Sequence, residues 1–146
     1  MKRPITISGA GCSLIDNLFN NIDFSGETFR NYLSKNPGDG GLIPGQLVFT
    51  EEFEEFAGEN INSILDKLIG NRPPDAYNVG GPAIVALINA AQLTHELGTR
   101  VFFYGARGED VNGHHLTDLL GKTPIDTSHY KTTGKPTPYT NVLSDP

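Results

Sequence analysis

The sequence predicts an α/β fold in which a central, mostly parallel sheet is flanked by helices. From Ala76 onward, strand-like and helix-like segments alternate, which is typical of a parallel sheet. Glycines follow these segments at the points where the chain is expected to turn. Two further β-prone stretches, about 47–50 and 130–144, do not fit the alternation, and we expect them to form a small separate sheet.

The N-terminal half begins with a short strand. Residues 5–8 are rich in β-branched side chains and run into Gly9-Ala10-Gly11, which indicates a strand followed by a tight turn. Residues 23–45 look largely irregular. Thr50 is placed to cap a helix whose first turn is acidic, and the helical pattern resumes at Ile61 and ends at Gly70.

The second half carries the clearest pattern. A strand over 76–79 leads into Gly80-Gly81, and Pro82 suits the first position of a helix because its missing N–H would be unpaired there. This helix is expected to reach Leu97 and to be buried on most sides, because it is apolar almost all round. A strand over 101–104 and a helix over 111–120 complete the pattern.

Composition limits the classes of partner. The chain has 146 residues and a formal net charge of −6, which disfavours nucleic acid and anionic membranes as partners. Cys12 is the only cysteine, so no intrachain disulfide is possible. No long apolar run follows the basic start of the chain, so we expect a cytoplasmic protein without a membrane span.

Two local features could form a ligand site. Asp16 follows the first glycine turn, and we expect it at the C-terminal edge of the first strand, where parallel α/β sheets bind ligands. Its carboxylate could accept hydrogen bonds from two hydroxyls, or it could simply cap the next segment or face solvent. Gly80 and Gly81 would let a ligand approach the backbone, or they could form a turn without a ligand.

Other motifs carry less weight. Gly9-Ala10-Gly11 matches a dinucleotide fingerprint only in part, because Leu14 occupies the position of the third glycine. We therefore expect no dinucleotide binding. The four histidines lack the spacing of metal ligands, and no P-loop or nucleophile elbow is present, so no metal site is expected in this chain.

Read in order, these features resemble the ribokinase-like (PfkB-type) carbohydrate kinases. Gly80-Gly81-Pro82 with its helix, then Leu97-Gly98, then the strand and the run 105–113 with the pattern GxxGxDxxG, are similar to the first signature of that family. Residues 119–127 are similar to the segment that follows. Asp16 matches an early aspartate of the family that contacts substrate. The resemblance covers nearly the whole chain and is most specific over 80–113.

The resemblance implies that residues 1–146 are the N-terminal, substrate-binding part of a kinase. Asp16, Gly80 and Gly81 would hold the acceptor, and the segments near 47–50 and 130–144 would form a lid that excludes water and that often pairs between subunits, giving a possible homodimer. The parent would use ATP and Mg²⁺ to phosphorylate a sugar hydroxyl. A nucleoside such as adenosine is an alternative acceptor, suggested by the long segment between Asp16 and Gly80.

Two departures from the family pattern stand out. The family usually has an asparagine four residues after the second glycine, where this chain has Val85. The catalytic base of the family lies in a late Gly-x-Gly-Asp motif, and this chain contains no such motif. We therefore expect no catalytic residue and no nucleotide site in this chain, with the C-terminal, nucleotide-binding half absent. A catalytically inactive, truncated sugar-binding module remains a further alternative.

Overall fold

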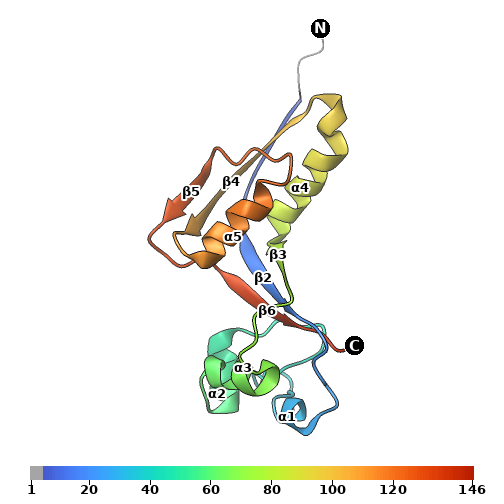
Figure 1. Cartoon of the computed structure of the whole chain (residues 1–146), viewed down its shortest axis with the longest axis vertical. Coiled ribbons are helices and arrows are strands. Elements are labelled where there is room, and N and C mark those ends of the chain that lie inside the picture. Colours follow the sequence, from blue (N-terminus) through green and yellow to red (C-terminus); the bar gives the residue numbers. More distant parts are fainter. Residues whose placement is uncertain (1–4) are drawn as a thin grey trace. The chain divides into compact units, whose positions relative to one another are not determined.

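A computed structural model describes residues 5–146. The strands are β1 (Thr6–Ala10), β2 (Leu14–Phe19), β3 (Ala76–Gly80), β4 (Arg100–Gly108), β5 (Tyr130–Thr133) and β6 (Tyr139–Leu143) (Figure 1). The helices are α1 (Glu27–Arg30), α2 (Thr50–Ala57), α3 (Ile61–Ile69), α4 (Pro82–Thr94) and α5 (Val111–Leu120), with a 3₁₀ turn η1 (His95–Leu97) after α4.

The chain divides into two compact units. One contains the chain up to Leu18 together with Asp75–Val142, and the other contains Phe19–Pro74 and Leu143–Pro146. The first unit holds β1, β3, β4, β5, α4 and α5. The second unit has two apolar clusters of its own, one around Phe29 and one around Phe53.

The predicted α/β architecture with a mostly parallel sheet is confirmed in the first unit. β4 lies between β1 and β5, and both neighbours run parallel to it. A second sheet has the order β3-β2-β6, in which β2 and β3 are antiparallel. The fold therefore combines a parallel three-stranded sheet with a second three-stranded sheet that contains an antiparallel pair.

Helices α4 and α5 cover the same face of the β1-β4-β5 sheet (Figure 1). Alternate residues of β4 point to that face, as the strand period requires. They pack in one cluster with the apolar stripe of each helix. The buried members on these three elements are Ile84, Leu87, Ala91, Val101, Phe103, Leu116 and Leu120.

Helix α4 differs from its prediction, because it is not buried on most sides. Only Ile84, Leu87 and Ala91 are buried on it, whereas Leu93 is 82% exposed. The helix contacts the sheet through one stripe, and no other described element covers its opposite side. Gly98 ends η1 in a left-handed conformation with φ of 71°, as the sequence predicted for the end of this helical segment.

The prediction of a strand at 47–50 is wrong. Residues 47–49 form no strand, and Thr50 is the first residue of α2, whose N-cap is Phe49. The stretch 130–144 does form two strands, as predicted. They do not form a separate sheet with residues 47–50, because β5 extends the parallel sheet and β6 joins β2.

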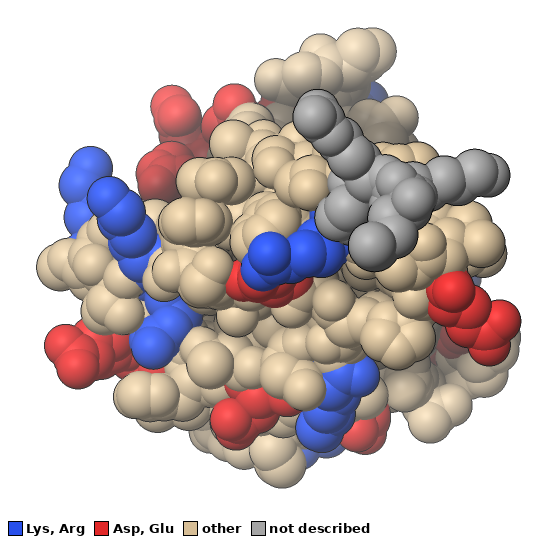
Figure 2. Space-filling view, turned by 90° about the horizontal axis from the view of Figure 1, so that it is seen from above, with Lys and Arg blue, Asp and Glu red and all other residues tan. Residues whose placement is uncertain are grey.

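Charged side chains are mixed in sign on the face that Figure 2 presents. Lys and Arg side chains are interspersed with Asp and Glu, and uncharged residues occupy much of the area between them. Among the residues coloured there, the basic side chains form no single continuous patch. The sequence as a whole is acidic, with 17 acidic and 11 basic residues.

Candidate functional site

Asp16 lies in the middle of β2 and not at the end of β1, where the sequence placed it. β1 ends at Ala10, and a short connection leads directly into a second strand that contains the aspartate. The sequence reading missed this strand because Leu14–Phe19 mixes apolar residues with Asp and Asn and shows no clean alternation. Asp16 is directly opposite Asn78 of the antiparallel strand β3.

The structure brings Asp16 and Gly80 together. A Cβ atom placed on Gly80 would lie 2.7 Å from one carboxylate oxygen of Asp16 and 2.8 Å from the other, and it would also overlap Leu14. Gly80 is buried at the end of β3, so its missing side chain provides the space that the carboxylate occupies. A residue with any side chain would displace the carboxylate.

Gly81 has a different role, set by its backbone. It is the N-cap of α4 with φ of 107° and ψ of 122°, a conformation that L-residues rarely adopt. A Cβ there would lie 2.6 Å from the carbonyl oxygen of Cys12, whose thiol is exposed. Pro82 occupies the first turn of α4, as predicted. The paired glycines therefore allow β3 to turn into α4 directly against the connection between β1 and β2.

The Asp16 carboxyl is partly withdrawn from water. Burial raises its pKa above the ordinary value of 3.8, and a hydrogen bond with the side chain of Thr140 opposes part of that rise. Since the carboxylate is an acceptor, the Thr140 hydroxyl is the donor when Asp16 is ionised. The remaining lone pairs of the carboxylate can accept hydrogen bonds from a ligand.

Strand β6 places Thr140 beside Asp16. The Ile15 N–H donates to the Pro138 carbonyl at 3.1 Å, and the Asn17 amide donates to the Asn141 side chain at 3.1 Å. Both bonds fit one register of neighbouring parallel strands, in which Asp16 is next to Thr140. Asn78 and Thr140 are thus the two site neighbours that the sequence analysis did not select.

The opposite face of this sheet is closed. Ile15 alternates with Asp16 along β2, has no exposed surface, and belongs to the core cluster with Ile84 and Leu116. Val79 of β3 packs against the same cluster. Because strand side chains alternate between faces, Asp16 points away from this core and toward solvent. Asn78 is exposed, while Asp16 and Thr140 are half-buried.

The GxxGxDxxG run of 105–113 fixes the segment that leads into β6. The Asp110 carboxylate accepts from the Gly113 N–H at 2.8 Å, capping α5, and from the Thr137 N–H at 2.7 Å. The buried Thr137 hydroxyl in turn accepts from the Gly108 N–H at 2.8 Å. A Cβ on Gly108 would lie 2.6 Å from the Lys135 carbonyl oxygen. The motif therefore anchors residues 135–137, three residues before Thr140.

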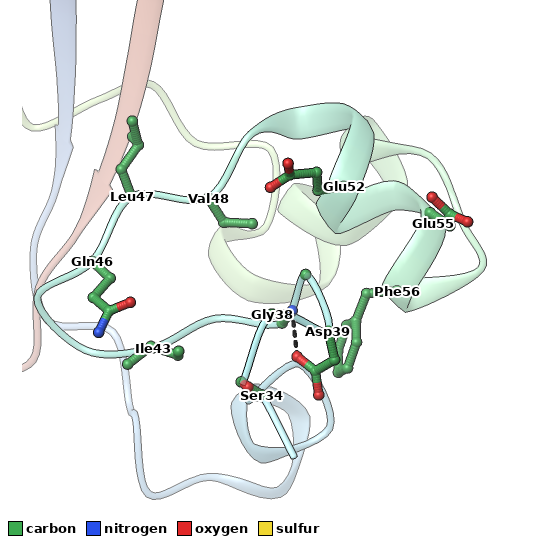
Figure 3. A pocket seen from close by; sticks show the side chains of 12 residues that line it. Ser34, Gly38, Asp39, Ile43, Gln46, Leu47, Val48, Glu52, Glu55 and Phe56 are labelled. Atoms are coloured by element: carbon green, nitrogen blue, oxygen red, sulfur yellow. Dashed lines mark hydrogen bonds between the residues drawn. The ribbon is translucent and has the colours of Figure 1, made fainter. Parts of the chain in front are cut away.

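The second unit contains a cavity of about 540 Å³ (Figure 3). Its walls come from the loops around Asp39 and Leu47 and from α2, which contributes Glu52, Glu55 and Phe56. The Asp39 carboxylate is already committed to its own loop, because it accepts from the N–H groups of residues 35, 36 and 41. These bonds lower its pKa to about 2.

The glycine-rich loop at 38–41 is consequently a closed turn and not a phosphate cradle. Its Gly41 N–H points to Asp39, and a Cβ on Gly40 would lie 2.5 Å from the Glu52 carbonyl oxygen of α2. Among residues 5–146, no group of three or more His, Cys, Asp or Glu side chains is arranged to hold a metal ion. Over the same residues, no helix is both long and apolar enough to cross a bilayer.

Comparison with known proteins shows the fold alone. No family model matches the chain, and no curated protein matches it. A crystal structure from Agrobacterium tumefaciens, named a "putative ribokinase", is similar, with 18% sequence identity and a TM-score of 0.50. The match covers 98% of this chain and 33% of that one, so this chain spans a third of the length of that protein. The fold of the chain is therefore that of a ribokinase-like α/β protein.

Proposed function

We propose that this chain is the acceptor-binding part of an ATP-dependent kinase that phosphorylates a hydroxyl group of a sugar. The proposal rests on one observation above all: the Asp16 carboxylate lies against the bare backbone of Gly80 on the open face of a sheet. A carboxylate that is half-buried and has free lone pairs suits a neutral polyhydroxy compound. The ribokinase-like fold supports the same class of activity.

The role of this chain is to bind and orient the acceptor. Holding the reacting hydroxyl in one position is a substantial part of catalysis in a two-substrate reaction. We expect ATP and Mg²⁺ to be bound by residues outside this chain, because the sequence has no Gly-x-Gly-Asp motif and the 38–41 loop is closed on Asp39. ATP, Mg²⁺ and the catalytic base belong to the proposed full-length parent, and we derive no phosphoryl-transfer step from this chain.

The proposal also includes a lid over the acceptor, a homodimer and a cytoplasmic location. β5 and β6 would contribute to a lid over the acceptor, and a homodimer through that lid is part of the hypothesis. We place the protein in the cytoplasm, with no nucleic acid or membrane as a partner. The lid and the homodimer depend on the kinase assignment, whereas the location and the excluded partners rest on the charge and the apolar pattern of the sequence.

The proposal predicts that Asp16→Asn weakens sugar binding by at least about tenfold, because the amide cannot accept on both atoms. The measurement is titration of the purified chain with a panel of pentoses and hexoses, followed by calorimetry or amide chemical shifts. Asp118→Asn, an exposed change on α5, is the matched control and should bind as the unaltered chain does. Equal affinity in Asp16→Asn would remove the site.

The same experiment has a pH arm. Binding uses the ionised carboxylate, and the pKa of Asp16 is raised by burial. Affinity should therefore fall as the pH is lowered, beginning at a higher pH than for an ordinary aspartate, while Asp16→Asn should show no such dependence. Loss of binding with the same pH profile in both proteins would assign the effect to another group.

Two alternative functions are each supported by a feature of this chain. A nucleoside kinase is favoured by the long segment between Asp16 and Gly80, much of which folds as a compact unit of its own. A sugar-binding module without catalysis is favoured by Val85, which is 38% exposed on α4 where an asparagine is usual in the family. Adding adenosine to the panel separates the first alternative. For the second, the parent with ATP and Mg²⁺ would bind sugar without turnover.

A further inference from the structure

One row of polar side chains crosses three strands on the open face of the β3-β2-β6 sheet. Asn78 lies directly opposite Asp16 in the antiparallel pair. On the other side, the register between β2 and β6 places Thr140 beside Asp16, where its hydroxyl is positioned to donate to the carboxylate. Residues opposite each other on neighbouring strands project from the same face of a sheet. The central carboxylate therefore has a polar neighbour on each side.

The three side chains offer different hydrogen-bonding groups. Asp16 only accepts, and the Thr140 hydroxyl gives its proton to Asp16, which leaves the hydroxyl oxygen as an acceptor toward a ligand. Asn78 is the only one of the three that can still donate, through its amide NH₂. It is exposed, and no hydrogen bond from its side chain is made within residues 5–146. The row thus has donors at one end only.

We propose that Asn78 and Thr140 determine which polyol the site accepts. They would do so by hydrogen bonding to the ligand oxygens on either side of the hydroxyls bound to Asp16. This inference rests on the proposed function and goes beyond it by assigning specificity to named residues. The ligand is a neutral compound whose hydroxyls donate to Asp16 and Thr140 and which presents an acceptor oxygen to Asn78. Epimers that differ next to the Asp16-bound hydroxyls should be distinguished.

The surroundings explain why Asn78 can select a ligand and need not be polar for folding. Its side chain has no hydrogen-bond partner within residues 5–146, whereas on the other face of the sheet Asn17 donates to Asn141 at 3.1 Å. Replacing an exposed side chain without a partner changes stability by less than about 0.5 kcal/mol. A change in ligand preference on replacing Asn78 would thus report a contact with the ligand.

The test compares ratios of affinities. The chain is titrated with ribose and with its epimers arabinose and xylose, and the variants are Asn78→Ala and Thr140→Val, which removes the hydroxyl at nearly constant volume. Thr140→Ser restores the hydroxyl and should rescue the original preference. Asn89→Ala, at an exposed position on α4, is the control. We expect each of the two test variants to weaken the preferred sugar by roughly threefold to tenfold and to reduce the ratio between epimers.

The outcomes separate the two levels of the proposal. If Asp16→Asn abolishes binding while Asn78→Ala and Thr140→Val keep the original ratio between epimers, the inference fails and the proposed function survives. If the unaltered chain binds none of the panel, sugars and adenosine included, the proposed function fails and the inference fails with it. A changed ratio in both variants, with rescue by Thr140→Ser, supports the inference.

Discussion

The absence of a Cβ atom at Gly80 matters both for the packing of the fold and for the proposed site. Its missing Cβ leaves space for the Asp16 carboxylate and for Leu14, so Gly80→Ala must push one of them aside. We expect a loss of roughly 1–3 kcal/mol in the free energy of unfolding, together with weaker polyol binding. Chemical denaturation measures the first effect and sugar titration the second.

The matched change is Gly134→Ala. No atom lies within 4 Å of the position that a Cβ would take there, in the connection between β5 and β6. This variant should keep both stability and binding close to those of the unaltered chain. If Gly80→Ala proved equally harmless, the close packing of Asp16 against Gly80 would not exist in solution.

The sequence offered Asp16, Gly80 and Gly81 as candidates because each follows a local pattern of turn and strand residues and matches the family resemblance. Asn78 could have been found as well, since it precedes Gly80 by two positions and therefore shares its face of the strand. Thr140 could not. It is separated from Asp16 by 124 positions, and only the register of β2 against β6 brings the two together.

Helix α5 shows how one side chain can serve two elements. Asp110 caps α5 through the Gly113 N–H and also holds the Thr137 N–H, both at less than 3 Å. Asp110→Ala removes both acceptors, and we expect it to cost about 1–2 kcal/mol in the free energy of unfolding. Because Thr137 precedes β6, the variant should also weaken polyol binding through Thr140.

The pH dependence has a defined sign. Hydrogen bonds from the Thr137 backbone and side chain, followed by the Gly113 N–H, lower the pKa of Asp110 below 3.8. Its stabilising contribution is therefore complete above that value and is lost as the pH falls through the lower, folded-state pKa. Asp118→Ala on the exposed side of α5 is the control. An Asp110→Ala protein as stable as this control would contradict the network.

Prediction at the level of elements succeeded where the patterns were long. The helices at 61–69, 82–94 and 111–120 appear close to their expected bounds, each with glycine at or soon after its end. The expected strand at 47–50 failed because β-propensity alone does not provide a neighbouring strand. There Leu47 and Phe49 are 70% and 63% exposed, and Val48 packs on the cluster around Phe53.

Considered as a whole, the first unit covers its parallel sheet on one side only. Val101 and Phe103 point toward α4 and α5, while the alternate residues Phe102 and Tyr104 point to the other side. There the Tyr104 ring stacks on His129 with centroids 4.4 Å apart. Parallel sheets are usually covered on both faces. The sequence correctly predicted the apolar character of α4 but not its one-sided burial, which depends on contacts with segments distant in the sequence.

This one-sided packing makes a prediction for two leucines on α4. Leu87 is 9% exposed and Leu93 is 82% exposed. Leu87→Ala should lower the free energy of unfolding by about 2–5 kcal/mol, because it opens a cavity in the core. Leu93→Ala should change it by less than about 0.5 kcal/mol. Denaturant titration of both variants at low protein concentration makes the comparison, and equal losses would show that α4 is covered on both sides.

The position of Cys12 has a practical consequence. It is the chain's single thiol, it is exposed, and its carbonyl oxygen lies against Gly81 at the start of α4. A maleimide dye would therefore attach at one place only, on the connection that joins β1 to the strand carrying Asp16. Fluorescence from that dye offers a direct readout of events around the aspartate without any engineered cysteine.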